Sequence, residues 1–258
     1  MERSKLDGLV SVITPVYNCA EVISITVDAV ASQTISVIEH ILVDDGSTDG
    51  TLKVIEALAK KYDHLIILRQ GNSGAGVARN LGINAATGRY IAFLDGDDCW
   101  SAKKLEAQIG FMERQNVLFS YGAYNEINSE SGEFIAHSEP PSELTYAQLL
   151  NGCPIGCLTV AYNQQVLGKR FMPSARRGQD WGLWLSITRS GVVAYKYPGN
   201  FALYNRSPNS LSKNKISKFF DVYGIYRNQE KLSVLAAIFC LTRHIFYVLK
   251  KQKVRNGS

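Results

Sequence analysis

The segment from Arg89 to Trp100 reads RYIAFLDGDDCW, and it joins an apolar run to a cluster of acids. The run Tyr90–Leu94 has the apolar and aromatic character of a strand inside a sheet. Asp95, Asp97 and Asp98 follow it within four residues and repel one another unless a cation is present. Hard oxygen ligands on a tight turn suit Mg²⁺ or Mn²⁺ bound together with a substrate diphosphate. The alternative is a surface turn whose Asp98 caps the next helix.

Comparable runs precede this segment at regular intervals. We expect strands at 9–14, 38–44, 64–68 and 90–94, with helices near 21–33, 51–61 and 76–86. Strands and helices that alternate at this spacing predict βαβ units. The fold class is therefore α/β, with a mostly parallel central sheet and helices on both faces. In such sheets, ligands bind at the carboxyl ends of the strands.

Polar segments follow all four of these strands, at 15–18, 44–47, 70–74 and 95–98. We therefore expect a tyrosine, two acidic pairs and a glycine loop at one edge of the sheet. Beside two acidic turns, Tyr17 is expected to stack on a base, although a lone tyrosine in such a place also serves simple packing.

The turn DDGSTDG at 44–50 brings carboxylates to the end of the second strand. Asp44 and Asp45 can there accept hydrogen bonds from a nucleobase or from ribose hydroxyls. The residues from Asp45 to Glu56 also have the spacing of an EF-hand calcium loop. However, the preceding segment is β-branched and no second such loop occurs, so we favour a nucleotide. Asp49 is expected to cap the helix that begins at Thr51.

The segment GAGVAR at 74–79 resembles the beginning of a dinucleotide-binding loop. Its third glycine is replaced by Arg79 and it follows the third strand instead of the first, which argues against an NAD site. A glycine loop that opens a helix still directs backbone N–H groups and Arg79 towards phosphate. The alternative is that these glycines serve only a tight turn.

A further acid lies downstream in RRGQDWGLW, at 176–184. Asp180 stands at the start of an apolar helix, where a carboxylate acts as a general base or as a simple cap. Trp184 lies one helical turn later on the same face and is expected to wall a site around Asp180.

Composition and charge exclude several classes of protein. Hydrophobic residues at 46% and charged residues at 20% are near globular averages, which excludes a disordered chain. Residues 213–258 hold ten Lys and Arg against two acids, a net +8, which leaves −3 on the first 212 residues. This distribution argues against a nucleic-acid partner and fits a tail that meets an anionic surface.

The cysteines and the N-terminal residues indicate the cellular compartment in which the chain is expected. Five scattered cysteines without a CxxC pair indicate neither a disulfide framework nor a zinc site. The N-terminal residues lack the apolar stretch of a signal peptide, so we expect a reduced chain in the cytoplasm. The sequence also lacks the HExxH, GxSxG and GxxxxGK[ST] patterns, which argues against zinc hydrolases, serine hydrolases and P-loop NTPases.

One apolar stretch, at 232–249, is a candidate for membrane contact. Arg243 and His244 interrupt it, so a membrane span is not expected. One interpretation is an interfacial helix on an anionic leaflet, with Lys250, Lys251 and Lys253 beside it. The other is a helix packed on the protein's own core.

Taken together, the motifs resemble those of family 2 glycosyltransferases, which have the GT-A fold. The matching segments are SVITPVYN at 11–18, VDDGSTD at 43–49, NSG at 72–74 with ARN at 78–80, and FLDGDD at 93–98 with Trp100. The resemblance covers about residues 8–210, and the segments at 154–160 and 179–184 are similar to the bacterial cell-surface polysaccharide branch. We expect a GT-A domain over 1–212, with a nucleotide-sugar half at about 8–115 and an acceptor half at about 116–212. A basic, partly apolar helical segment over 213–258 completes the chain.

The resemblance implies an inverting transfer of a sugar from a nucleotide diphosphate sugar, with UDP or TDP expected, to a hydroxyl of a glycan that is expected to be lipid-linked. The nucleotide-sugar contacts are expected at Pro15, Tyr17, Asp44, Asp45, Arg79 and Asp95. Asp95 and Asp97 fall on the family's DxD motif, with Asp97 as the direct ligand of Mg²⁺ or Mn²⁺. Asp180 falls on the acid of the family's ED-like motif and is the expected general base, with Gln179 in place of the usual Glu.

Two other functions remain open at this point. A nucleotidyltransferase that makes a nucleotide sugar normally has a glycine-rich, basic triphosphate loop after the first strand, where this chain has PVYN. A non-catalytic nucleotide or sugar binder has no obvious need of Asp180. For the favoured function we expect a cytoplasmic protein in peripheral contact with the inner face of the plasma membrane.

Overall fold

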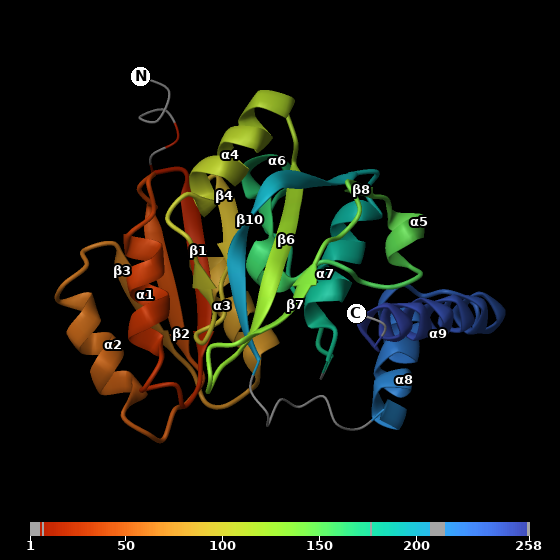
Figure 1. Cartoon of the computed structure of the whole chain (residues 1–258), viewed down its shortest axis with the longest axis horizontal. Helices are drawn as coiled ribbons and strands as arrows, with labels where there is room; N and C mark the ends of the chain where they lie inside the picture. Colours follow the sequence, from red (N-terminus) through yellow and green to blue (C-terminus); the bar gives the residue numbers. More distant parts are fainter. Residues whose placement is uncertain (1–5, 7, 176, 207–214, 257–258) are drawn as a thin grey trace.

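The computed structural model describes residues 6, 8–175, 177–206 and 215–256. A ten-stranded sheet runs through the molecule in the order β3-β2-β1-β4-β9-β6-β10-β5, with β7 beside β6 and β8 beside β10 (Figure 1). The strands are β1 (Val10–Val16), β2 (Glu39–Asp44), β3 (Leu65–Arg69), β4 (Tyr90–Phe93), β5 (Cys99–Trp100), β6 (Phe119–Asn128), β7 (Phe134–Ser138), β8 (Glu143–Leu144), β9 (Ala161–Asn163) and β10 (Ala194–Arg206).

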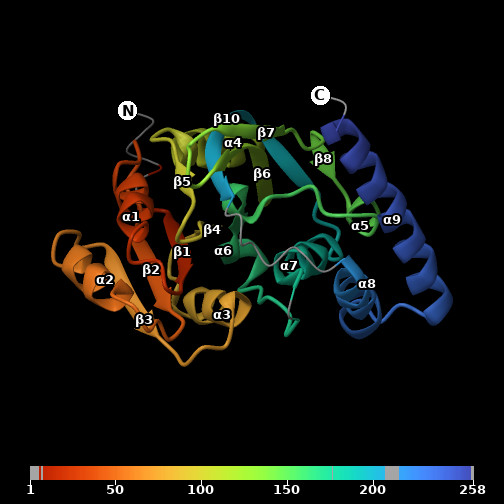
Figure 2. The ribbon, with the colours of Figure 1, turned by 60° about the horizontal axis from the view of Figure 1, so that its bottom comes forward.

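Helices cover both faces of this sheet. They are α1 (Ile23–Ala31), α2 (Thr51–Ala59), α3 (Ala75–Ala85), α4 (Lys104–Gln115), α5 (Tyr146–Leu149), α6 (Gln164–Leu167), α7 (Gln179–Thr188), α8 (Lys215–Gly224) and α9 (Val234–Asn256), with a 3₁₀ helix at Cys157–Thr159 and a π-helix at Ile225–Gln229. The helices α3 and α7 pack in the core on one face, whereas α1, α2 and α4 pack on the other. The helices α8 and α9 lie at the end of the molecule beside α7 (Figure 2).

The first four long strands are parallel neighbours. β1 pairs in parallel with β2 and β4, and β2 pairs in parallel with β3. Their carboxyl ends therefore meet at one edge of the sheet. The rest of the sheet is mixed, because β9 runs antiparallel to β4 and β6, whereas β6 and β10 are parallel. The predicted α/β fold is thus confirmed.

Close packing of α3 against the parallel strands explains why these strands are apolar and why α3 contains a glycine at position 82. All residues of β2 are buried, as are all of β1 except the half-buried Pro15. Ile13 lies in one cluster with Ala78 and Ile83 of α3. At Gly82 of α3 a Cβ atom would lie 2.6 Å from Cγ2 of Ile13, so only glycine lets the helix approach this closely.

Two features of the second half differ from the sequence-based expectations. The apolar segment at 158–162, which its sequence predicts to be one strand, is a 3₁₀ helix followed by the short β9. The 13-residue β10 was not predicted, although it pairs with β5, β6 and β8. Pro198 and Gly199 interrupt its alternation, and the register against β6 shifts between Lys196 and Asn200. The strand therefore lacks a continuous two-residue period.

The C-terminal helices share the core of the body. Ile225, Tyr226, Ala237 and Cys240 are buried in the same cluster as α3 and α7. The predicted helix at 232–249 thus packs on the protein's own core through one of its faces. Among the residues that the structure describes, no helix is long and apolar enough to span a bilayer.

Candidate active site

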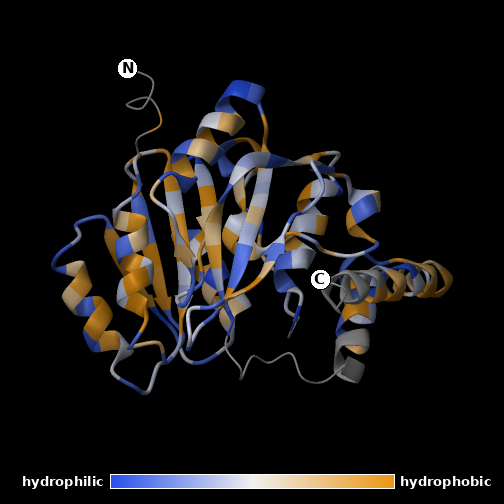
Figure 3. Cartoon of the chain, in the orientation of Figure 1, coloured by the Kyte–Doolittle hydropathy of each residue, from blue (hydrophilic) through white to orange (hydrophobic). Residues whose placement is uncertain are grey.

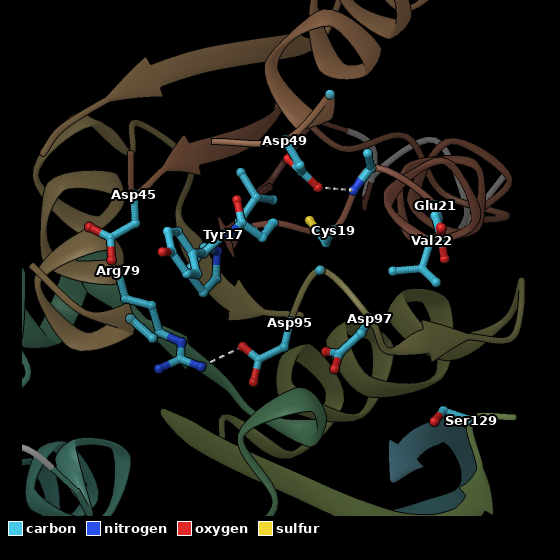
Figure 4. Close-up of a pocket in the computed structure, with 17 residues that line it drawn as sticks. Tyr17, Cys19, Glu21, Val22, Asp45, Asp49, Arg79, Asp95, Asp97 and Ser129 are labelled. Carbon is cyan, nitrogen blue, oxygen red and sulfur yellow. Dashed lines mark hydrogen bonds and ion pairs between the residues drawn. The ribbon is translucent and has the colours of Figure 1, made fainter. Parts of the chain in front are cut away.

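A pocket of about 930 Å³ opens at the carboxyl edge of the parallel strands (Figure 4). Its walls come from the loop after β1, the turn after β2, the first turns of α3 and the turn after β4. Six of the residues expected at the site line it, namely Pro15, Tyr17, Asp45, Arg79, Asp95 and Asp97. Asp44 and Asp180 are not among its lining residues.

The loop after β1 presents Tyr17 to this pocket. The Tyr17 side chain is 50% exposed and lies between Asp45 and Cys19 in Figure 4. Asn18 adopts the left-handed conformation (φ 48°), which asparagine tolerates better than most residues. Its amide oxygen accepts a 2.9 Å hydrogen bond from the Thr48 backbone, and its backbone N–H donates to the Ser47 hydroxyl at 3.1 Å. The β1 and β2 loops therefore fix the position of Tyr17 together.

Asp45 joins the end of β2 to the glycine loop. Its Oδ1 accepts from the Ser73 backbone at 2.8 Å and from Gln70 Nε2 at 2.7 Å, and its Oδ2 accepts from the Gly74 backbone at 2.8 Å. A carboxylate offers about four lone pairs, so Oδ2 keeps one for a ligand in the pocket. Gly74 has φ +92°, a conformation that favours glycine and makes this loop possible.

Asp44 is fully buried and has structural partners instead. Its carboxylate accepts from the Ser47 backbone at 3.0 Å and forms an ion pair with Arg69 Nε at 3.2 Å. Successive side chains of a strand point to opposite faces, which turns Asp44 away from the pocket that Asp45 lines. We therefore leave Asp44 out of the proposed nucleotide contacts.

The calcium-loop alternative does not fit this geometry. Asp49 accepts from the backbone of Thr51 at 2.9 Å and of Ala20 at 3.3 Å, whereas Asp45 faces the glycine loop. Asp49 thus stabilises the first N–H of α2 as predicted, although Gly50 occupies the N-cap position. In the described part of the chain, no group of three or more acidic, histidine or cysteine side chains forms a metal site.

Two residues from other elements hold the acidic turn after β4. The Thr26 hydroxyl of α1 lies 3.0 Å from the Gly96 carbonyl oxygen and 2.9 Å from that of Asp98. The Asp98 carboxylate accepts from the Asn205 backbone at 2.9 Å, and the Asn205 amide donates to the Asp97 carbonyl oxygen. The alternative interpretation, in which Asp98 caps the next helix, is wrong, because α4 has Lys103 at its N-cap without a side-chain bond. Asn205 was missed because its strand, β10, was not predicted.

Three carboxylates crowd this turn. Burial and then the charge of Asp95 raise the pKa of Asp97, and burial and its two acidic neighbours raise the pKa of Asp98 well above its usual value. The guanidinium of Arg79 forms an ion pair with Asp95, which leaves Asp97 better placed to ligate a cation (Figure 4). Mg²⁺ and Mn²⁺ sites on nucleotides use one or two carboxylates together with phosphate oxygens, and the Asp95–Asp97 turn fits that arrangement.

Asp180 reaches this region through the contact between α3 and α7. A Cβ on Gly76 of α3 would lie 2.6 Å from Cδ of Gln179, so the two helices start side by side. Burial raises the pKa of Asp180, as does the charge of Asp95, while Arg79 opposes the increase. Asp180 itself does not line the pocket, but both of these charged neighbours, Arg79 and Asp95, do.

Trp184 does not take part in the site. Its side chain is fully buried, with ring centroids 5.9 Å from Phe93 and 5.4 Å from Phe119. The prediction that Trp184 walls a site around Asp180 was wrong, because one helical turn after Asp180 this side of α7 packs against the core residues Phe93 and Phe119.

A pocket with an aromatic side chain, paired acidic turns and an arginine at the carboxyl edge of this sheet is typical of a nucleotide-sugar-dependent glycosyltransferase with the GT-A fold. Residues 11–171 match the protein-family model described as glycosyl transferase family 2, and the chain belongs to this family. Asp180 lies outside the matched residues.

Relatives match over nearly the whole chain. A putative teichuronic acid biosynthesis glycosyltransferase, TuaG of Bacillus subtilis, is 37% identical over 95% of this chain and 97% of its own length. The Escherichia coli protein named UDP-Glc:alpha-D-GlcNAc-diphosphoundecaprenol beta-1,3-glucosyltransferase WfgD is 37% identical over 98% of this chain and 99% of its own length.

Solved structures show the same fold. TarS 1–349 of S. aureus in complex with UDP-GlcNAc superposes with a TM-score of 0.68 at 20% identity, over 92% of this chain and 71% of that one. The mannosyltransferase PcManGT of Pyrobaculum calidifontis, in complex with GDP-Man and Mn²⁺, gives 0.65 at 17% identity over 96% and 76%. The chain is therefore an inverting glycosyltransferase with a GT-A fold.

Proposed function

We propose that this glycosyltransferase moves a hexose from a UDP-sugar or TDP-sugar to a hydroxyl of a lipid-linked glycan, in the synthesis of a cell-surface polysaccharide. The observation that carries the proposal is the gathering of Asp45, Arg79, Asp95 and Asp97 around one pocket. Asp180 follows Gln179, which packs against Gly76 of the helix that carries Arg79. The names of TuaG and WfgD, the second with a diphosphoundecaprenol acceptor, support the acceptor class.

The nucleoside occupies the pocket between Tyr17 and Asp45. The exposed Tyr17 ring stacks on the base, and the free lone pair of Asp45 Oδ2 accepts from the imide N–H of uracil or thymine. Pro15 lines the same wall. Complexes of TarS with UDP and with UDP-GlcNAc support a uridine nucleotide.

The diphosphate lies against Arg79 and the acidic turn. Burial lowers the pKa of the Arg79 guanidinium, but the charge and hydrogen bond of Asp95, together with Cys157 and Asp180, raise it by more, so the buried Arg79 stays charged. Asp97, with Asp95 beside it, would hold Mg²⁺ or Mn²⁺. A divalent cation there stabilises the negative charge that develops on the leaving nucleoside diphosphate.

Asp180 acts as the general base. The acceptor oxygen attacks the anomeric carbon, the bond from that carbon to the diphosphate oxygen breaks, and the hydroxyl proton passes to Asp180. A sugar hydroxyl is a poor nucleophile, so this proton transfer contributes about 10²–10⁴ to the rate. One displacement on the face opposite the leaving group inverts the anomeric centre.

The placement of the site residues supports the predicted division of the domain into a nucleotide-sugar half and an acceptor half. Residues 8–115 supply the pocket walls apart from Ser129, and α7 with Asp180 belongs to the acceptor half within 1–212. Within the expected segment 213–258, α8 and α9 add helices on that side, and the chain works at the cytoplasmic face of a membrane as a peripheral protein.

A thermal-shift panel with UDP, TDP, GDP and CDP tests the donor site, each nucleotide with Mg²⁺, Mn²⁺ or EDTA. A ligand at about 100 times its Kd stabilises the folded state by about 2.7 kcal/mol. We expect a higher melting temperature with UDP or TDP and a metal, and a loss of the shift in EDTA. No shift with any nucleotide, together with no transfer from any nucleotide sugar, would contradict the proposal.

A further inference from the structure

The helix α9 exposes an apolar stripe on the side that faces away from the body. Leu235, Ile238, Phe239, Phe246 and Leu249 are each between 48% and 80% exposed. Their spacing of three and four residues, with the exposed Thr242 in the gap, places them on one helical face. We call these five residues the outer stripe. The hydrophobic colouring of α9 is visible at the right of Figure 3.

The opposite face of α9 holds the helix on the protein. Ala237 and Cys240 are buried in the main core. The His244 ring stacks on Trp181 with centroids 5.2 Å apart, and the Tyr247 ring fills the space beside Gly152, where a Cβ would lie 2.4 Å from it. The fold therefore does not need the outer stripe for its own packing.

Charge distinguishes between possible occupants of this stripe. The sequence of α9 contains five Lys and Arg residues and no Asp or Glu. Arg243 lies 5.6 Å from the ring centre of Phe239, next to the stripe. Glu230, just before the helix, is buried and accepts from the Tyr146 hydroxyl at 2.6 Å. Two copies that paired through α9 would bring like charges together, whereas an anionic bilayer attracts them.

We propose that the outer stripe of α9 inserts into the surface of an anionic lipid bilayer, with the helix parallel to the membrane plane. Apolar side chains on one face, beside cations, are what an interfacial helix requires. The inference deepens the proposed function and rests on its lipid-linked acceptor. Because Trp181 contacts α9 and adjoins Asp180, this docking fixes the height of the candidate base above the membrane.

Co-sedimentation of the full chain with vesicles tests the docking. One set of vesicles contains phosphatidylcholine alone, and the other mixes it with phosphatidylglycerol. We expect binding to the mixed vesicles, weakened by added salt, because the attraction is screened. The double variant Phe239→Ser, Phe246→Ser should lose at least about tenfold in vesicle affinity, since each buried phenyl ring contributes strongly to partitioning.

The matched control is Phe134→Ser. Phe134 is 63% exposed on β7, so the same change there leaves vesicle binding as in the wild type. Leu235→Ser is a second, milder change in the stripe and should give an intermediate loss. The circular dichroism spectrum and melting temperature of each variant show whether it is folded.

Three results would overturn the inference. One is equal binding by the folded double variant and the wild type. Another is binding that does not depend on phosphatidylglycerol. The third is a wild-type dimer, seen by light scattering, that the double variant converts to a monomer without a change in vesicle binding.

A transfer assay with a water-soluble acceptor separates this inference from the proposed function. The double variant should keep wild-type transfer to the soluble acceptor and lose transfer to the same glycan on lipid in vesicles. Vesicle binding without transfer to either acceptor would leave the docking in place and contradict the proposed function.

Discussion

Gly76 and Gln179 pack so closely that a Cβ on Gly76 would lie 2.6 Å from Cδ of Gln179. Gly76 lies in the first turn of α3, three residues before Arg79, and Gln179 is the first residue of α7, next to Asp180. The contact therefore couples the helix that brings Arg79 to the donor pocket with the helix that brings the candidate base. The Gln179 amide also donates to the Ala175 carbonyl oxygen at 2.7 Å, which fixes the chain before α7.

Gly76→Ala should reduce kcat by about tenfold, because Gln179 must move and a small misplacement of reacting groups is costly. Alanine favours a helix over glycine by about 0.5–1 kcal/mol. This gain offsets the cost of moving Gln179, so the melting temperature should change little. Removing the obstacle with Gln179→Ala should restore kcat in the double variant. If the double variant stays as slow as Gly76→Ala, the contact is not the cause.

Asp180→Asn should lower kcat by about 10²–10⁴, because the amide cannot accept the hydroxyl proton. The Kd of the nucleotide diphosphate, measured by calorimetry, should stay near the wild-type value. Asp28→Asn, an exposed position on α1, serves as the control and should keep kcat. Unchanged turnover in Asp180→Asn would exclude Asp180 as the base.

The acid limb of kcat against pH should report Asp180. Burial, followed by the Asp95 charge, raises its pKa, so activity should fall at a higher pH than the value of about 3.9 of an ordinary aspartate implies. Arg79 opposes that increase, so Arg79→Gln should move the limb to still higher pH. The profile is measured at saturating donor and metal. A limb that moves to lower pH in Arg79→Gln would contradict this electrostatic account.

Asp98→Asn should stabilise the protein in EDTA at neutral pH. The pKa of Asp98 is raised in the folded state, so its charged form costs stability above that pKa, and the cost disappears as the pH falls through it. Asparagine keeps an acceptor for the Asn205 N–H and removes the repulsion. We expect a gain of about 1 kcal/mol, or about 2–4 °C in Tm. The gain should shrink in acid, and a gain that is constant with pH would count against the explanation.

Tyr17→Ala should weaken UDP or TDP binding by about tenfold or more, since a base stacked on an aromatic ring contributes about 1–3 kcal/mol. Tyr17→Phe keeps the ring and should keep the affinity. Calorimetric titrations of both variants compare the two. Equal losses in both would assign the effect to the hydroxyl and not to stacking.

The sequence by itself determined the parallel half of the fold and most of the donor pocket. Local sterics and hydrophobic periodicity define strands and helices, and parallel strands bring their ends to one edge, so Tyr17, Asp45, Arg79, Asp95 and Asp97 could be placed together in advance. The family resemblance added a role for Asp180, which no local pattern in the sequence links to these residues.

Only the tertiary structure decided which polar groups face the pocket and which hold it together. Asp44 and Asp45 are neighbours in sequence, yet one is buried against Arg69 and the other lines the pocket. Asn205 supports the acidic turn from a strand whose alternation is broken. On α9, packing against Trp181 buries one apolar face and leaves the other exposed. Which side chains become buried depends on contacts between segments that are far apart in the sequence. A local sequence pattern carries no information on the free energies of those contacts.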